Sequence, residues 1–448
     1  MSLTRKLGRF VAATSFARLP EQAIATAKLG FTDCTATMIA GAQEEAPLLL
    51  RQALAPAAGP ATLTFGGEHC APAEAAWING TAGHALDYDD VALRGHPSTV
   101  LVPAILAEGE ARDVSGRDMI AAYVAGYEVW AELAGRDPGQ HHRKGWHPTG
   151  IFGAIGAAAA CAALRRLDGE RAAQALALAA SQSGGLLANF GTMTKPFHAG
   201  RAAYAGLVSA RLAELGFTAS LDALEHPQGF LAAVSPAGEA DRETPPRGLG
   251  TAWKIVEEGL GIKKYPACYC THRALDAMLD LMARHPLQPS DIERITVSLS
   301  DTHALILRNH APETGLAAKF SIEFAMAAAV VARRAGLAEY TDAFVRRPEI
   351  RRLMGRVRVA TNRDYDPELP GAARFDQVTV ELKGGGTLAS EKVGRARGHA
   401  ERPLGQDELF AKFRDCLAAG RARVAPQVLF DRLLCLEALS ARALTAVV

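Results

Sequence analysis

A lysine and a histidine stand three residues apart in the Gly- and Thr-rich segment 190–201 (FGTMTKPFHAGR). Lys195 and His198 follow a long run of small apolar residues, and Pro196 breaks the helical pattern, so we expect both side chains in a loop or at a helix start. An amine and an imidazole together can hold a carboxylate and move a proton. A solvated lysine near a helix cap is the alternative that this segment alone leaves open.

A second group of ionisable residues lies within residues 84–100 (HALDYDDVALRGHPSTV): His84, Asp87, Asp89, Asp90, Arg94 and His96. A D-x-D-D run can bind Mg²⁺ or Ca²⁺ through its carboxylate oxygens. It can equally cap a helix, because Asp stabilises helix N-termini, or supply a single buried acid. The spacing differs from that of an EF-hand loop, and we predict no metal site.

The most basic stretch is residues 140–151 (QHHRKGWHPTGI), with His141, His142, Arg143, Lys144 and His147. Three histidines could ligate zinc, but their spacing is not that of the helical H-x-x-x-H pair of zinc proteases. The segment leads into an apolar helix, and a helix N-terminus with adjacent His and Lys favours an anion. A polar loop with one helix-capping histidine is the alternative.

A fourth cluster, residues 261–273 (GIKKYPACYCTHR), lies where the sequence pattern changes from one domain to the next. It contains Lys263, Lys264 and His272, and domain interfaces are preferred places for small-molecule pockets. Cys268 is a candidate nucleophile if nearby cations lower its pKa. A buried structural thiol is the alternative reading.

The 448 residues carry a net charge of +1 and are 49% hydrophobic and 22% charged, which is ordinary for a globular protein of two or three domains. Nothing in this composition indicates binding to nucleic acid or to an anionic membrane. Seven scattered cysteines favour reduced thiols and a cytoplasmic protein over a disulfide framework or a four-thiolate zinc site. Phosphate-binding loops, dinucleotide-binding motifs and the serine-hydrolase elbow are missing from the sequence.

The periodicity of apolar residues predicts a mainly α protein. Amphipathic or buried helices are expected at 19–42, 150–167, 170–183, 201–215, 271–284, 316–335 and 407–419. Strands are expected at 292–300, 357–361, 376–383 and 388–393, with a Gly-rich turn before the last of them. The pattern predicts a large all-helical domain of residues 1–265 and 400–448 and a smaller α+β domain of residues 266–399.

Taken together, the four clusters resemble the MmgE/PrpD family. The resemblance is carried, in family order, by HALDYDD, GHPST, GWHPTG, FGTMTKPFHAGRAA, IKKYPACYCTHRALDAM, AKFSIEFAMA and RGHAERPLGQDELFAKFRDC. It implies a helical domain, a smaller α+β lid domain, a pocket between them, a homodimer and an enzyme that needs no metal or cofactor. Family members act on di- or tricarboxylates through a carbanion next to a carboxylate.

The resemblance also assigns roles to residues of this chain. It implies that Asp87, His96, His147, Lys195 and Lys263 line the pocket. On this basis we predict His147, Lys195, Cys268 and Asp87 as catalytic residues, of which Cys268 is our own hypothesis, and His96, Arg94, Lys263, Lys264 and His272 as substrate-binding residues. Such cations would hold the carboxylates and stabilise enolate-like charge, while a histidine or lysine of suitable pKa moves the proton.

Three positions depart from the pattern of the family's decarboxylases. A hydroxyl residue expected after the D-x-D-D run is Val91, an expected histidine is Cys268, and an expected tyrosine is Phe324. Two proton donors of the pocket are therefore missing. The segments FGTMTKP, RGHPS, GWHPT and KFSIE, with a Pro-x-Cys-Tyr element, are more similar to the iminodisuccinate epimerase branch, in which an acid and a base work on opposite faces of a carbon. Cys268 is our candidate for one of them, with Lys195 or His147 opposite.

The sequence therefore predicts an isomerase that abstracts the proton α to a carboxylate in a substituted dicarboxylate. A lyase resembling 2-methylcitrate dehydratase or aconitate decarboxylase is the alternative reaction. A carboxylate-binding protein without activity is the alternative of another class.

Overall fold

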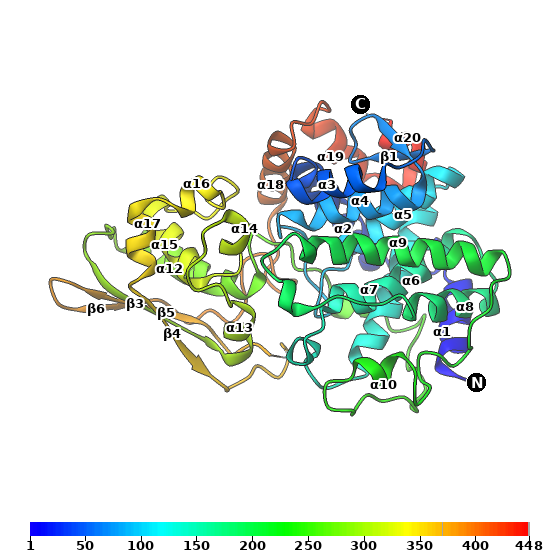
Figure 1. Ribbon diagram of the computed structural model, residues 1–448, viewed down its shortest axis with the longest axis horizontal. Coiled ribbons are helices and arrows are strands. Elements are labelled where there is room, and N and C mark those ends of the chain that lie inside the picture. The colour runs from blue at the N-terminus through cyan, green and yellow to red at the C-terminus, as the bar shows by residue number, and fades with distance from the viewer. Residues whose placement is uncertain (370, 447–448) are drawn as a thin grey trace. The chain divides into compact units, whose positions relative to one another are not determined.

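The computed structural model describes residues 1–369 and 371–446 and is mainly helical (Figure 1), as the periodicity predicted. The chain divides into two compact units. The first comprises Met1–Ala188, Met193–Gly261 and Gly405–Val448, and the second comprises Ile262–Leu404 with the short segment Asn189–Thr192. The sequence prediction had assigned residues 266–399 to the smaller domain.

The first unit is built from α-helices with a few short 3-10 turns. In chain order these are α1 (Leu3–Ala13), η1 (Phe16–Arg18), α2 (Glu21–Gly41), α3 (Glu45–Leu54), α4 (Pro72–Ala85), α5 (Ser98–Arg112), α6 (Gly116–Gly135), η2 (His141–Lys144), α7 (Pro148–Leu164), α8 (Gly169–Ala180), α9 (Thr194–Glu214), α10 (Phe230–Val234), α11 (Lys254–Glu257), α18 (Gln406–Ala419), α19 (Pro426–Leu434), η5 (Leu436–Ala438) and α20 (Ala441–Thr445). A further turn, η3 (Leu187–Asn189), ends at the boundary between the units.

Helix α7 is the centre of this unit, and nearly every residue of it is buried. Helices α6 and α9 pack against it, which its all-apolar sequence predicted. Close approach depends on small residues, since a Cβ added at Gly206 of α9 would lie 2.4 Å from the Cβ of Ala157 in α7. At Gly200 an added Cβ would lie 2.1 Å from the carbonyl oxygen of Trp77 in α4. These contacts fix α9, and with it Lys195, against α4 and α7.

The prediction that this unit is all helical was wrong in one place. Strands β1 (Ala61–Leu63) and β2 (Glu68–Cys70) form an antiparallel hairpin. The reason is a contact with a residue distant in sequence, because the backbone N–H and hydroxyl of Thr62 both donate to the buried carboxylate of Glu110, at 2.8 and 2.5 Å. Those bonds hold the segment extended against α5.

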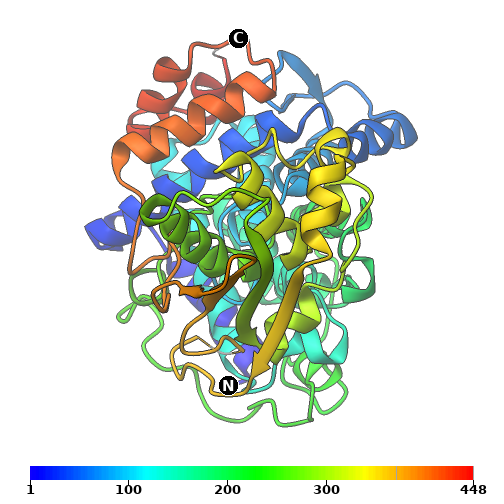
Figure 2. The ribbon, with the colours of Figure 1, turned by 90° about the vertical axis from the view of Figure 1, so that its left-hand side faces the viewer.

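The second unit combines short helices with one sheet. Its elements are η4 (Tyr269–Thr271), α12 (His272–Arg284), β3 (Ile292–Ser300), α13 (Asp301–Ile306), α14 (Gly315–Ala318), α15 (Ile322–Ala332), α16 (Asp342–Val345), α17 (Pro348–Met354), β4 (Val357–Asn362), β5 (Gln377–Leu382) and β6 (Thr387–Ala389). The strand order is β4-β3-β5-β6, and β3 pairs parallel with β4 and antiparallel with β5. Figure 2 shows β3 and β4 side by side.

The core of the second unit lies between this sheet and its helices. The side chains of Ile295, Val297 and Leu299 on β3 are fully buried, and α12 and α15 pack on one side of the sheet, as Figure 1 shows. The alternation of residues 292–300 predicted this half-buried strand correctly.

One helix of the second unit was predicted as continuous and is not. In place of a helix at 316–335, α14 and α15 are separated at residues 319–321. The Ser321 side chain accepts a hydrogen bond from the backbone N–H of Phe324 and so starts a new helix. The sequence pattern hid this break, because the apolar spacing runs through it.

The remaining predicted helices are present within a few residues of their expected ends, as α2, α7, α8, α9, α12 and α18. Helix α9 begins earlier than expected, with Pro196 in its first turn, where a backbone N–H has no partner within the helix. Lys195 therefore lies at a helix start. None of the described helices is both long and apolar enough to cross a membrane.

Candidate active site

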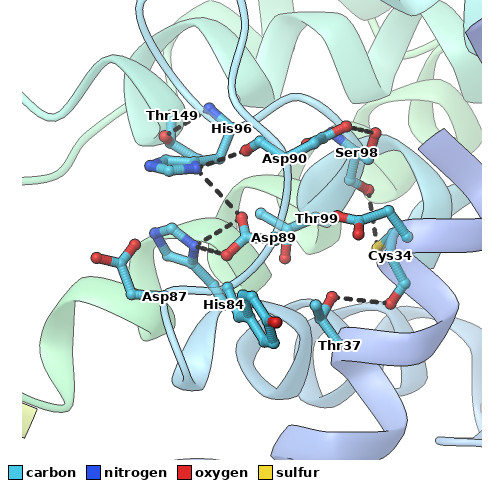
Figure 3. Close-up of polar contacts among 12 residues, drawn as sticks. Cys34, Thr37, His84, Asp87, Asp89, Asp90, His96, Ser98, Thr99 and Thr149 are labelled. Atoms are coloured by element: carbon cyan, nitrogen blue, oxygen red, sulfur yellow. Dashed lines mark hydrogen bonds and ion pairs between the residues drawn. The ribbon is translucent and has the colours of Figure 1, made fainter. Parts of the chain in front are cut away.

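The carboxylate of Asp89 lies between two imidazole rings in the first unit (Figure 3). Both of its oxygens lie 2.9 Å from Nδ1 of His84, and Oδ2 lies 3.3 Å from Nδ1 of His96. Burial raises the pKa of Asp89, but attraction to and hydrogen bonds from the two histidines outweigh burial and hold that pKa well below its ordinary range. Asp89 is thus an ionised acceptor at neutral pH.

The loop between α4 and α5 carries these side chains. His84 lies in the last turn of α4, and Asp87 follows with a φ of 50°, a left-handed conformation that Asp tolerates better than most residues. At the other end of the loop, the Asp90 carboxylate accepts a hydrogen bond from the backbone N–H of Ser98 at 3.3 Å and another from its hydroxyl. Asp90 thereby ties the loop to the start of α5, two residues after His96.

Distant parts of the first unit hold the middle of this loop. Nζ of Lys412, on α18, donates to the carbonyl oxygen of Tyr88 at 2.7 Å and pairs with Asp33 of α2 at 2.6 Å. Val91 and Gly261 exchange backbone hydrogen bonds at 2.8 and 2.9 Å. The loop is therefore fixed by side chains and backbone that no local pattern could reveal.

Lys195 connects this group to α9. Its Nζ atom lies 2.8 Å from Nε2 of His84 and 2.9 Å from Oδ1 of Asp87, and the lysine is almost fully buried. Because an ammonium group can only donate, Nε2 of His84 accepts, and the ring proton stands on Nδ1 facing Asp89. Burial, opposed by Asp89 and reinforced by Lys195, lowers the pKa of His84 to about 3, so this ring is neutral.

His96 is held in the same tautomer but is more accessible. Its Nδ1 lies 2.8 Å from the carbonyl oxygen of Asp90, and a carbonyl can only accept, so Nδ1 carries the proton. In the neutral ring the lone pair then stands on Nε2. The His96 side chain keeps 13% of its surface exposed, whereas the side chains of His84 and Asp89 keep none. His96 is thus the least buried of these three side chains.

A second imidazole pair borders the first. Nδ1 of His147, the residue before α7, lies 3.2 Å from Nδ1 of His198 in α9, and the His147 ring stacks against that of His84 with centroids 5.8 Å apart. Burial and the nearby Lys195 lower the pKa of His147 well below its ordinary value, and the same two causes lower that of His198 to about 4. Both rings are neutral at pH 7, and one donates to the other.

Asp90 differs from Asp89 in its protonation. Burial and the neighbouring Asp33 and Asp89 raise the pKa of Asp90 well above its ordinary value, against the hydrogen bonds from Ser98. The Ser98 hydroxyl also lies 2.6 Å from the hydroxyl of Tyr123 in α6. This buried chain of hydrogen bonds holds the back of the loop.

The other histidines of the basic stretch 140–151 are divided between two roles. Burial lowers the pKa of His142 to about 3, and His96 and Lys195 contribute to this shift, so His142 belongs to the same electrostatic environment. The ring of His141 instead packs edge-on against Phe152, and burial lowers its pKa to about 4. His141 therefore contributes to the packing of α7.

Arg94, predicted to bind substrate, is engaged with backbone. Its Nη1 donates to the carbonyl oxygens of Asp137 and Gly139, each at 2.9 Å, and burial lowers its pKa. Its role in substrate binding stays a prediction.

The remaining predicted residues lie in the second unit. Lys263 is fully buried, and Lys264 beside it is partly exposed. The backbone N–H of Cys268 donates to the carbonyl oxygen of Lys319 at 2.9 Å, and the thiol residue keeps 8% exposure. His272 begins α12, its ring lies close to those of Tyr265 and Tyr269, and its Nε2 donates to the carbonyl oxygen of Ala267 at 3.2 Å.

Two positions where the family pattern is broken have structural roles. Phe324 is fully buried in α15, with its ring edge-on to that of Tyr340 at 5.1 Å. Val91 contributes its backbone to the pair with Gly261.

Four of the described residues lie close enough together to serve as ligands of one metal ion. His84, Asp87, Asp89 and His96 place ligand atoms within 4.8 Å of one another, and no other such group of three or more is found in that part of the chain. However, Nζ of Lys195 already bonds to His84 and Asp87. The ammonium group of Lys195 thus supplies the positive charge that a metal ion would otherwise bring to these ligands. That the protein binds no metal here remains our prediction.

The structure brings together Asp87, His96, His147 and Lys195, four of the predicted site residues. It adds His84, Asp89, His142 and His198, which the sequence contained but which were not assigned to the site. The signal for His84 and Asp89 was the short spacing H-x-x-x-x-D after a helix. That spacing alone does not separate a helix cap from a hydrogen-bonded pair.

Comparison with known proteins supports the resemblance seen in the sequence. A model of the MmgE/PrpD N-terminal domain matches residues 5–243, and a model of the MmgE/PrpD C-terminal domain matches residues 265–432. Human cis-aconitate decarboxylase is 30% identical over 359 residues, covering 77% of this chain and 72% of the relative.

Two further relatives have the same name. The mouse cis-aconitate decarboxylase is 29% identical over 355 residues, covering 77% and 71% of the two chains. That of Aspergillus terreus is 26% identical over 373 residues, covering 78% and 75%. These three names are of lyases, so the similarity to an epimerase branch stays a prediction. Both domain models match in order over most of the sequence, and the chain belongs to the MmgE/PrpD family.

Proposed function

We propose that this chain is a cofactor-independent enzyme that removes or returns a proton at the carbon next to a carboxylate of a di- or tricarboxylate. The observation that carries this proposal is the buried chain Asp87–Lys195–His84–Asp89–His96, in which each neighbouring pair is in hydrogen-bond or ion-pair contact. It combines a fixed cation with an imidazole, that of His96, whose side chain is not completely buried.

His96 is the base that this arrangement favours. With its Nδ1 proton held by the Asp90 carbonyl and directed toward Asp89, the ring would accept a substrate proton at Nε2. The ionised Asp89 would then stabilise the imidazolium that forms. His147 is less suited to this step, because its pKa lies well below the ordinary value.

Lys195 is the group that would offset negative charge. When a proton leaves a carbon next to a carboxylate, charge spreads onto the carboxylate oxygens, and a preorganised ammonium in a dry site lowers the energy of that state. Lys195 meets this requirement, because it is buried and held by two partners.

Decarboxylation is the first candidate for the net reaction, because the relatives named above are cis-aconitate decarboxylases. In such a step the bond to the departing carboxylate breaks, its electron pair stays on the substrate carbon framework, and a protonated histidine returns a proton to carbon. The same charged groups would serve this step.

Epimerisation is the second candidate, favoured by Val91, Cys268 and Phe324 in place of a hydroxyl residue, a histidine and a tyrosine. Inverting a carbon needs proton transfer without loss of a group, so fewer donors suffice. Dehydration of a methylcitrate-like substrate is less favoured, since it also needs a donor for the departing hydroxide.

Proton NMR in deuterated water tests the proposal and separates the candidates. The purified protein is incubated with a panel of di- and tricarboxylates that includes cis-aconitate. Carbon dioxide release with a deuterated product indicates a decarboxylase, and deuterium uptake without a new compound indicates an epimerase. A His96→Gln variant serves as the inactive control. Carboxylate binding without proton exchange for any compound would overturn the proposal and favour the binding-protein alternative.

A further inference from the structure

The residues just before His96 form a tight turn with a strained backbone. Ala92 and Gly95 exchange backbone hydrogen bonds of 3.1 and 2.8 Å, and the two residues between them, Leu93 and Arg94, have φ values of 52° and 62°. Left-handed conformations at two successive positions of a turn are typical of glycine and asparagine and are strained for leucine and arginine. A strained turn persists only where its surroundings hold it, so the groups that contact this turn decide where His96 lies.

Three groups of the first unit hold the turn and His96. The indole N–H of Trp130 in α6 donates to the carbonyl oxygen of Leu93 at 3.3 Å. The guanidinium of Arg94 donates to two backbone carbonyl oxygens that follow α6. The hydroxyl of Thr149, in the first turn of α7, accepts a hydrogen bond from the backbone N–H of His96 at 3.2 Å (Figure 3). The last of these three contacts is the one made with His96 itself.

We propose that Thr149 is a positioning residue of the reaction, which fixes the backbone of His96 so that its imidazole is correctly placed for proton transfer. This inference rests on the proposed function, because that function assigns His96 as the base. Thr149 acts through His96 and not on the substrate.

The surroundings of Thr149 fit this role. Thr149 is fully buried, and a backbone N–H that faces a buried position needs an acceptor there. Gly95 lets the two segments approach, because a Cβ added at that position would lie 3.1 Å from Oγ1 of Thr149 and 2.9 Å from the ring of Trp130. The bond from Nδ1 of His96 to the carbonyl oxygen of Asp90 holds the ring, and the bond to Thr149 holds the backbone.

Thr149 also connects His96 to the second imidazole pair. His147 directly precedes α7, and Thr149 is the second residue of that helix. The hydrogen bond between Thr149 and His96 therefore ties the loop between α4 and α5 to the start of α7. Loss of this bond should move the ring of His96 relative to that of His147.

Two substitutions at position 149 test the proposal, since valine keeps the shape of threonine without its oxygen and serine keeps the hydroxyl. The substrate is the compound of the NMR panel that exchanges its proton fastest. We expect Thr149→Val to lower kcat about 10- to 100-fold with KM nearly unchanged, because a small displacement of a reacting group is costly. Thr149→Ser should keep most of the wild-type kcat.

Thr37→Val is the matched control and should have the wild-type kcat. Thr37 is a buried threonine of α2, and its hydroxyl donates within its own helix, to the carbonyl oxygen of Cys34 at 3.1 Å. The control therefore removes a buried hydroxyl from the same unit without removing a bond to the loop that carries His96.

Selective nitrogen-15 labelling of histidine measures the position of His96 independently of activity, with His96→Gln used to assign its signals. In Thr149→Val we expect faster solvent exchange of the His96 backbone amide and altered ring signals, and in Thr149→Ser we expect both as in the wild type. A wild-type kcat in Thr149→Val, or a lower kcat with unaltered His96 signals, would overturn the proposal. If the wild type exchanges no carboxylate proton, the proposed function fails. Altered His96 signals in Thr149→Val would then still support the positioning contact, and unaltered signals would overturn it as well.

Discussion

The ammonium nitrogen of Lys195 lies 2.8 Å from Nε2 of His84. The two residues are 111 positions apart in sequence, and the contact exists because glycines in α9 allow that helix to approach α4 and α7. Because the ammonium group of Lys195 can only donate, Nε2 of His84 must accept. The ring proton of His84 therefore lies on Nδ1, which faces Asp89.

Replacing Lys195 by methionine should remove the cation with little change in side-chain volume. We expect the rate of substrate deuterium exchange to fall about 100- to 1,000-fold, because a preorganised donor in a buried site is lost. Lys254→Met is the matched control, since Lys254 is exposed and paired with Glu257 at 2.6 Å. Exchange rates measured by NMR should be normal in the control, and equal rates in both variants would remove Lys195 from the reaction.

A smaller side chain at position 195 should uncover a metal site. In Lys195→Ala the donors of His84, Asp87, Asp89 and His96 remain without an ammonium group among them, so we expect Co²⁺ to bind where the wild-type protein binds none. Isothermal titration and the visible absorption of Co²⁺ measure this. Adding Asp87→Asn should weaken the binding, and equal binding by wild type would show that the ammonium does not exclude the metal.

Asp89→Asn tests how the two imidazoles are positioned. An amide has one oxygen, so it can accept from His84 or His96 but cannot hold both rings as the carboxylate does. We expect kcat to fall about 100-fold with KM nearly unchanged, because Asp89 is fully buried. Nitrogen-15 spectra of the histidine rings should show altered tautomers. Unaltered ring spectra with lower activity would assign Asp89 a different role.

His198→Gln should make stability less sensitive to acid. The pKa of His198 is about 4 in the folded protein, against about 6.5 in an unfolded chain. Between pH 6.5 and about pH 4 the histidine is protonated in the unfolded state but stays neutral in the folded state. Protonation therefore favours the unfolded state, and the free energy of unfolding decreases as the pH is lowered through this range.

Between pH 7 and pH 5 the wild type should therefore lose about 1 to 2 kcal/mol more than His198→Gln. Urea unfolding at both pH values measures the difference. His285→Gln, at an exposed histidine of the second unit, is the control and should follow the wild type. A variant that loses as much stability as the wild type would mean that His198 takes up its proton in the folded state.

Cys268→Ser tests the predicted acid or base role of that thiol. If Cys268 moves the α-proton, deuterium exchange should fall about 100-fold, whereas Cys270→Ser should keep most of it in reducing buffer. Full exchange by Cys268→Ser would end the catalytic assignment of Cys268.

Much of the fold could be predicted from periodicity, because long helices such as α7 and the strand β3 have strong patterns. The break before Ser321 could not, since a single side-chain cap divides an otherwise continuous apolar pattern. The β1–β2 hairpin depends on Glu110, which is 48 residues from Thr62. Both differences come from individual hydrogen bonds that apolar spacing does not encode.

The sequence predicted several residues of the candidate site, but it only partly predicted which of their side chains contact one another. Lys195, Asp87, His96 and His147 were assigned through the family's motifs, and they do lie near one another. The buried partners His84 and Asp89 needed the structure, because their importance comes from which atoms meet. The supports from Lys412 and Gly261 are distant in sequence from Tyr88 and Val91, the loop residues that they hold.

The different protonation of Asp89 and Asp90 has a consequence for recognition. Judged from the sequence alone, the D-x-D-D run of Asp87, Asp89 and Asp90 is a strongly acidic segment that should repel a polycarboxylate. Folded, Asp90 keeps its proton, Asp87 is neutralised by Lys195, and Asp89 is left as the one carboxylate whose charge is shared by two rings. An anionic guest would therefore meet one uncompensated carboxylate charge rather than three, so that its capture needs less opposing charge than the sequence alone implies.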